Sequence, residues 1–92
     1  MNAIRERDVE KYLVRRVKER GGEVRKCKWI GRRGAPDRVV FLKGTYWVEL
    51  KAPGETPRPE QVREHRRMGS QDAYVYVLDS FERVDNFMGT FA

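Results

Sequence analysis

Apolar residues near the start of the chain recur at helical spacing. Val9, Leu13 and Val17 follow one another at intervals of four residues, which in an α-helix places them on the same face. The surrounding residues are mostly charged, so the pattern predicts an amphipathic helix over residues 5–20. Gly21-Gly22 follows and is expected to end this helix.

Four later stretches have the alternating or continuous apolar pattern of strands. Residues 23–29 alternate but are too polar for a strand buried on both faces. Residues 34–51 contain two apolar runs around Gly44, which predicts two antiparallel strands joined by a tight turn. Residues 73–78 (AYVYVL) are almost continuously apolar, which predicts a strand buried on both faces.

Two further helices are expected after the third strand. A proline-containing loop over residues 52–59 precedes a helix that begins near Pro59, because proline suits a first helical turn. This helix connects two strands, so those strands should be parallel neighbours with a right-handed crossover. Asp79 or Ser80 is expected to cap a final helix. Its apolar side chains are more than packing on a sheet requires, which suggests contact with another subunit; they are Phe81, Val84, Phe87, Met88 and Phe91.

These elements predict one small α/β domain over residues 1–92, in the order α-β-β-β-α-β-α, with a mixed central sheet flanked by helices. The chain has a formal net charge of +6 and charged residues make up 37% of it. A basic chain of this size favours an anionic polymer as partner, with nucleic acid first. No apolar run is long enough to span a membrane, and Cys27 has no cysteine to pair with. We therefore expect a cytoplasmic protein.

Charged residues with candidate chemistry lie at the end of the third predicted strand. Because side chains alternate along a strand, Trp47, Glu49 and Lys51 share one face. If the preceding strand begins at Asp37 and pairs antiparallel across Gly44, Asp37 lies beside Glu49 and Lys51. Two carboxylates and an ammonium group would then meet at one sheet edge. This set predicts a site for a divalent cation, with a lysine next to it.

The ordered motifs of the chain resemble those of a known nuclease superfamily. Pro36-Asp37 and Glu49-Leu50-Lys51 match the pattern from which the PD-(D/E)XK superfamily takes its name. The closer resemblance is to its virus-type replication-repair nuclease (VRR-NUC) branch, and it covers nearly the whole chain in the right order. The matching features are Glu10 on the first helix, Gly34-Ala35-Pro36-Asp37, Val48-Glu49-Leu50-Lys51, the loop from Pro53 to Pro59, and Gln61.

This resemblance implies a restriction-endonuclease-like core and hydrolysis of phosphodiester bonds with Mg²⁺ or Mn²⁺. Asp37 and Glu49 are hard oxygen ligands suited to these ions, and the backbone carbonyl of Leu50 is a further ligand in related enzymes. Lys51 would orient the attacking water and stabilise negative charge. Gln61 would hydrogen-bond water or phosphate nearby. The competing interpretation of Asp37, Glu49 and Lys51 is a buried salt bridge, which is costly to bury.

The role of Glu10 has two interpretations. As the third acid of the site it would bind a second cation or hold a water of the first. Alternatively, it is a boundary glutamate paired with an arginine such as Arg5 or Arg16, and Glu6, one turn earlier, then takes its role. His65 is the only histidine, and we expect it to be a surface residue rather than a metal ligand.

The basic residues near these motifs are candidate contacts to DNA phosphates. They are Arg32, Arg33, Arg38, Arg58, Arg63, Arg66 and Arg67. Their alternative role is to form a solvated surface with local ion pairs. Trp29 and Ile30 precede the basic loop Gly31-Arg32-Arg33-Gly34. Both are expected in the core, with base stacking and a subunit contact as alternatives.

Stand-alone members of the VRR-NUC branch resemble Holliday junction resolvases and are often of viral origin, which implies a bacterial or phage-infected host cell. The resemblance therefore favours a homodimeric, structure-selective DNA endonuclease that makes symmetrical nicks in a four-way junction. A flap or splayed-arm nuclease of the same family is the first alternative. A non-catalytic DNA-binding module and a basic RNA-binding domain are the others, and neither needs Asp37, Glu49 and Lys51 together.

Overall fold

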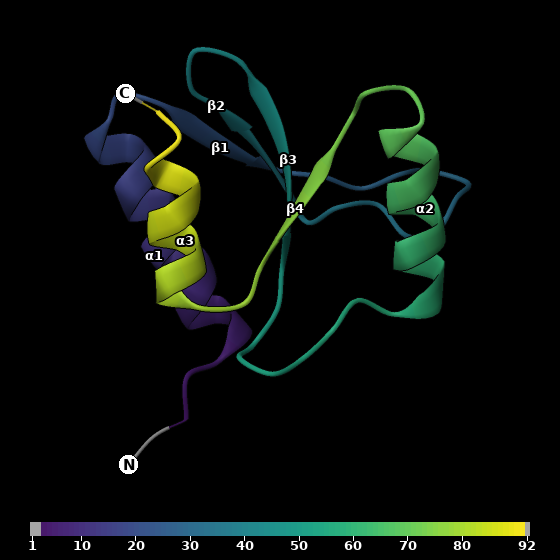
Figure 1. The fold of residues 1–92 in the computed structure, drawn as a ribbon, viewed down its shortest axis with the longest axis horizontal. Helices are drawn as coiled ribbons and strands as arrows, with labels where there is room; N and C mark the ends of the chain where they lie inside the picture. Colours follow the sequence, from purple (N-terminus) through teal and green to yellow (C-terminus); the bar gives the residue numbers. More distant parts are fainter. Residues whose placement is uncertain (1–2, 92) are drawn as a thin grey trace.

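The computed structural model describes residues 3–91 and has the predicted order of elements. Figure 1 shows three layers: α1 and α3 lie on one side of the sheet, and α2 lies on the other. The mixed α/β architecture with helices on both sides of the sheet is thus confirmed. The elements are α1 (Glu6–Glu19), β1 (Glu23–Lys26), β2 (Arg38–Phe41), β3 (Thr45–Leu50), α2 (Pro59–Gly69), β4 (Val75–Leu78) and α3 (Phe81–Met88).

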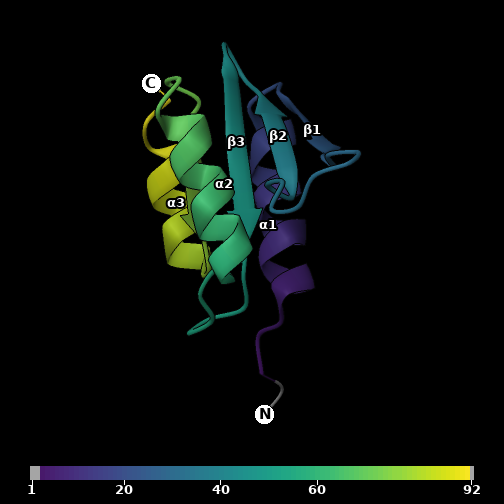
Figure 2. The same cartoon turned by 90° about the vertical axis from the view of Figure 1, so that its right-hand side faces the viewer.

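The four strands form one sheet in the order β1-β2-β3-β4. β1 pairs antiparallel with β2, and β2 pairs antiparallel with β3. β4 pairs parallel with β3, as expected for two strands joined through α2. Figure 2 shows β1, β2 and β3 side by side with α2 in front of the sheet.

The hydrophobic core lies between the sheet and the layer formed by α1 and α3. The stripe Val9, Leu13 and Val17 on α1 is completely buried, as the spacing predicts. Val48 and Leu50 of β3 belong to the same cluster, so even-numbered β3 residues face α1 and α3. Odd-numbered β3 residues therefore face α2, which places Glu49 in the layer opposite the main core.

The last helix begins as the sequence predicts, and most of its apolar face packs within the chain. The Ser80 hydroxyl accepts a hydrogen bond from the Arg83 backbone N–H at 3.0 Å and so caps α3. Val84, Phe87 and Met88 are buried in the chain's own core. Packing on α1 and the sheet therefore accounts for these three side chains, whereas Phe81 on the same helix is 38% exposed. The expectation that part of this face meets another subunit stays a prediction.

Two burial predictions are also wrong. β4 is an edge strand, and Tyr76 at its centre is 40% exposed although its ring packs on Phe87 of α3, because no further strand pairs with the outer side of β4. Ile30 is 97% exposed instead of lying in the core, because the segment between β1 and β2 extends away from the sheet toward α2 (Figure 1). Within residues 3–91 no helix has the length and apolar character needed to cross a bilayer.

Candidate active site

The strand register places Asp37 beside the end of β3. Arg38 pairs with Val48, so Asp37, one residue earlier, lies opposite Glu49 across the two antiparallel strands. The Leu50 backbone N–H donates a hydrogen bond to Asp37 Oδ2 at 2.8 Å. This bond fixes the Asp37 carboxylate at the same sheet edge as Glu49 and Lys51, as the sequence predicts.

A second set of contacts holds the Glu49 side chain under α2. Lys51 Nζ lies 3.2 Å from Glu49 Oε2, and Gln61 Nε2 donates to the same oxygen at 2.7 Å. Gln61 Oε1 in turn accepts a hydrogen bond from the Arg58 backbone N–H at 2.9 Å. Gln61 therefore caps the start of α2 with one end of its amide and orients Glu49 with the other.

The environment of the Glu49 carboxyl disfavours its ionised form. Burial and the nearby Asp37 carboxylate raise the pKa of Glu49 from 4.5 to about 7, although Lys51 acts in the opposite direction. Glu49 is fully buried, and its Oε1 atom has no hydrogen-bond partner within the described structure. A buried oxygen without a partner is costly. Its position between Asp37 and α2 suits a bound cation.

His65 is a member of this site that the sequence prediction missed. Its side chain is only 13% exposed, and Nε2 lies 3.9 Å from Glu49 Oε1. Burial lowers the pKa of His65 below its ordinary 6.5. The expectation of a surface histidine is wrong, because residue 65 lies one helical turn after Gln61 and so shares its face of α2. The four-residue spacing from Gln61 could have indicated this position from the sequence.

The acids of α1 are arranged differently from expectation. Arg38 Nε donates to Glu10 Oε2 at 3.0 Å, and Nη2 of the same arginine also contacts that oxygen. Glu10 thus pairs with an arginine, as its alternative interpretation proposed, but with Arg38 rather than Arg5 or Arg16. The Arg38 side chain is only 12% exposed, which favours this internal contact over one with DNA.

Glu6 is the α1 carboxylate whose electrostatic environment includes the site. Burial, followed by the negative charge of Asp37, raises the pKa of Glu6 above 4.5, whereas Lys51 lowers it. Asp37 and Lys51 therefore both lie within electrostatic range of Glu6. This was the fallback assignment from the sequence.

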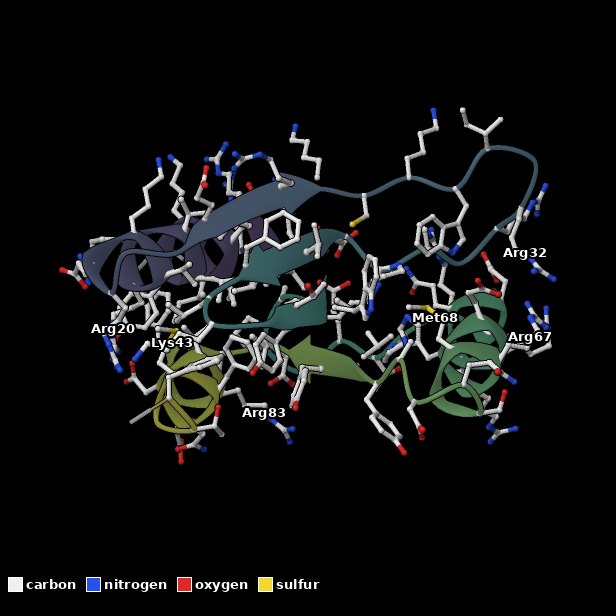
Figure 3. All side chains as sticks on the ribbon, turned by 90° about the horizontal axis from the view of Figure 1, so that it is seen from above. Arg20, Arg32, Lys43, Arg67, Met68 and Arg83 are labelled. Atoms are coloured by element: carbon white, nitrogen blue, oxygen red, sulfur yellow. The ribbon has the colours of Figure 1, made fainter. Side chains whose placement is uncertain are left out.

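A polar cleft opens beside these residues. It has a volume of about 350 Å³, and its lining includes Asp37 and Gln61 together with Arg33 and Arg58. Four further predicted DNA contacts, Arg32, Arg63, Arg66 and Arg67, are exposed. Figure 3 shows Arg32 and Arg67 extending from the same end of the molecule, the first from the loop before β2 and the second from α2.

Buried Glu64 joins that loop to α2, which the sequence did not indicate. Trp29 Nε1 donates to Glu64 Oε2 at 2.8 Å. Arg67 Nε donates to Glu64 Oε1 at 3.0 Å, and Arg32 Nε lies 3.6 Å from the same atom. The Trp29 ring packs edge-to-face on Trp47, with 5.8 Å between ring centroids. One carboxylate therefore organises the basic end of α2.

Within residues 3–91, no group of three or more His, Cys, Asp and Glu side chains is arranged to hold a metal ion. Asp37 and Glu49 nevertheless fit a hard cation that keeps several water ligands, because Mg²⁺ commonly binds through one or two carboxylates. The partnerless Glu49 Oε1 is the structural feature that supports this fit.

Two carboxylates next to a lysine at one edge of a sheet, with helices on both sides, match the arrangement expected of nucleases of the PD-(D/E)XK type. No family model matches the sequence. The chain is 49% identical over 82 residues to "Putative nuclease p44" of Acyrthosiphon pisum secondary endosymbiont phage 1, covering 87% of this chain and 88% of the relative. A solved structure described as "VRR_NUC domain" superposes with a TM-score of 0.86 at 39% identity, covering 98% of this chain and all of the other. The chain belongs to the VRR-NUC family of nuclease domains.

Proposed function

We propose that this nuclease is an endonuclease that hydrolyses DNA with Mg²⁺ or Mn²⁺ held by Asp37 and Glu49, and that it nicks branched DNA as a homodimer. The observation that carries the proposal is the meeting of Asp37, Glu49 and Lys51 at one sheet edge. The arginine-lined cleft beside them provides the route for a phosphodiester.

The side chains divide the work of hydrolysis between them. Asp37, Glu49 and the Leu50 carbonyl would hold the cation. When bound, the cation supplies a Lewis acid that lowers the pKa of water and neutralises charge on the phosphate. Lys51, held by Glu49 at 3.2 Å, would orient the attacking water and stabilise the developing negative charge. Gln61 keeps Glu49 in position through its 2.7 Å hydrogen bond.

The α1 acid of the site is assigned to Glu6 rather than to Glu10. Glu10 already pairs with Arg38, so its charge is compensated within the chain. Glu6 feels both Asp37 and Lys51. It would bind a second cation or hold a water of the first.

Phosphate contacts by the exposed arginines explain how so small a domain would bind DNA. Arg33 and Arg58 line the cleft itself. Arg32 is exposed on the loop before β2, and Arg63, Arg66 and Arg67 are exposed on α2. Contacts of this kind respond to the shape and backbone of DNA rather than to its sequence. Branched DNA is therefore a suitable substrate for a domain without a separate recognition helix.

A two-fold dimer would carry two sites for symmetrical nicks in a four-way junction. Since most of the apolar face of α3 is covered, the open edge of β4 is the better candidate interface. Tyr74 and Tyr76 are exposed there, and a hollow of about 430 Å³ lies between β4 and α3. Exposed edge strands readily pair with another chain.

The first experiment incubates the protein with labelled four-way junction, flap, duplex and single-stranded DNA, with EDTA, Mg²⁺ or Mn²⁺. We expect paired symmetrical nicks in the junction, and only with a metal. Dominant flap cutting would favour the alternative substrate. Cleavage of no substrate with either metal would contradict the proposed activity.

The second experiment tests whether two sites act together. Wild-type protein is mixed with Lys51→Met protein at increasing ratios, and light scattering gives the subunit count. If a dimer makes both nicks, mixed dimers cut a single strand, so single-nick products rise before total cleavage falls. If a monomer is active, the ratio of single to paired nicks stays constant.

A further inference from the structure

Ile30 lies at the tip of the turn between β1 and β2 and is 97% exposed. Gly31 follows it with φ 79°, a left-handed conformation that glycine adopts without strain. An isolated exposed apolar residue needs no explanation in itself. Ile30 differs from the other exposed apolar residues in its almost complete exposure, in how it is held and in the charge around it.

The residues on either side of the tip are fixed to α2 through a single buried group. Trp29 Nε1 donates to Glu64 at 2.8 Å, and Arg32 Nε lies 3.6 Å from the other oxygen of that carboxylate. The Trp29 ring is also packed on Trp47. The turn is therefore supported on both sides, and Ile30 is presented to solvent by an ordered backbone.

The positive charge of the segment around Ile30 favours a polyanion such as DNA as its partner. From Val24 to Pro36 the chain has five basic residues and no acidic one. Such a surface attracts a polyanion. It repels the same segment of a second copy of the chain, because both segments are basic and each whole chain has a net charge of +6. These basic residues are Arg25, Lys26, Lys28, Arg32 and Arg33.

The same segment leads directly into the catalytic cleft. Arg33 and Gly34 line the cleft with Asp37. Ile30 precedes Asp37 by seven residues, and so many residues span at most about 25 Å. At about 3.4 Å per base pair, this length corresponds to about seven base pairs, so Ile30 lies within about seven base pairs of Asp37.

We propose that Ile30 is an apolar wedge that inserts between bases at the branch point of a DNA substrate, while the surrounding basic residues hold the phosphates. Inserted Ile, Leu, Met or Phe side chains unstack base steps in other DNA-binding proteins. A branch point has bases whose stacking is already interrupted, so insertion costs least there. The inference rests on the proposed function and names the feature by which the enzyme selects branched over continuous duplex DNA.

The test compares Ile30→Ser with wild type, Ile30→Met and the control Ile4→Ser, which changes an exposed isoleucine on the segment before α1. Each protein binds a junction carrying 2-aminopurine at the branch point, without added metal, so that unstacking is seen as increased fluorescence independently of cleavage. We expect the increase with wild type, Ile30→Met and Ile4→Ser, and less than about half of it with Ile30→Ser. The preference for junction over duplex should fall about 10-fold in Ile30→Ser, the effect of removing one buried apolar side chain.

An unchanged fluorescence increase and an unchanged junction preference in Ile30→Ser would overturn the wedge and leave the nuclease proposal intact. A fall in subunit number in Ile30→Ser would also overturn it, because the tip would then be a contact between copies. If the wild type cuts no DNA with any metal, the proposed function fails, yet the fluorescence comparison still decides whether Ile30 enters the stack.

Discussion

The stability of the metal-free protein should respond to the ionisation of Glu49. Its pKa rises from 4.5 to about 7 in the folded chain, chiefly because the carboxyl is buried and secondly because Asp37 lies beside it. Between those values the folded protein binds more protons than the unfolded chain does. The contribution of Glu49 to folding is therefore favourable at low pH and is lost as the pH rises through about 7.

The size of the effect follows from linkage. Ionising Glu49 should lower the free energy of unfolding by about 2 to 3 kcal/mol between about pH 5 and about pH 8. His65 acts in the opposite direction. Burial lowers the pKa of His65 below 6.5, so near that pH His65 binds more protons in the unfolded chain than in the folded one. Its contribution to the free energy of unfolding therefore rises as the pH increases toward 6.5. The wild-type curve is the sum of both effects.

Comparing wild type with Glu49→Gln isolates the carboxyl, because the glutamine keeps the shape and cannot ionise. Urea unfolding in EDTA at several pH values should show the variant gaining about 2 to 3 kcal/mol over wild type toward high pH. The exposed Glu82→Gln change on α3 is the control and should follow wild type. A difference between wild type and Glu49→Gln that is independent of pH would refute the reasoning. Mg²⁺ or Mn²⁺ at high pH should stabilise wild type and not Glu49→Gln.

Three further changes test the site and its supports. Lys51→Met should remain folded by circular dichroism and lose at least about 100-fold in cleavage rate, since proton transfer and charge stabilisation contribute on that scale; near-normal cleavage would remove it from the chemistry. His65→Asn should require several-fold more Mg²⁺ for half-maximal rate, with the rate at saturating metal retained, because His65 lies 3.9 Å from Glu49 Oε1; an unchanged metal titration would contradict this. Gly34→Ala should lower the unfolding free energy by about 2 kcal/mol or more in urea titrations, because φ is +90° and the added Cβ would lie 2.5 Å from a backbone oxygen of α2. Gly54→Ala, with φ +86° and open space around it, is the matched control and should cost about 1 kcal/mol.

The relation among Asp37, Glu49 and Lys51 could be derived from the sequence because it depends on local rules. Alternation along a strand puts Glu49 and Lys51 on one face, and a tight hairpin fixes the register that brings Asp37 opposite. The start of α2 is equally local, since Pro59 and the residues next to it determine where a helix can begin.

The positions of Ile30, His65 and the α1 acids depended on how the elements pack together. Glu64 on α2 contacts Trp29 and Arg32 on either side of the turn at Ile30, so that the turn faces outward. Trp29 and Glu64 are 35 positions apart in the sequence. His65 is half-buried because α2 lies across the face of β3 that carries Glu49.

Glu10 pairs with Arg38 because α1 packs on the face of the sheet that carries Arg38 and Val48. Tyr76 remains exposed because β4 lies at the edge of the sheet. The spacing of residues along a helix or strand determines which side chains share a face. Which element covers that face depends on long-range docking, and for this reason only the tertiary structure could decide these positions.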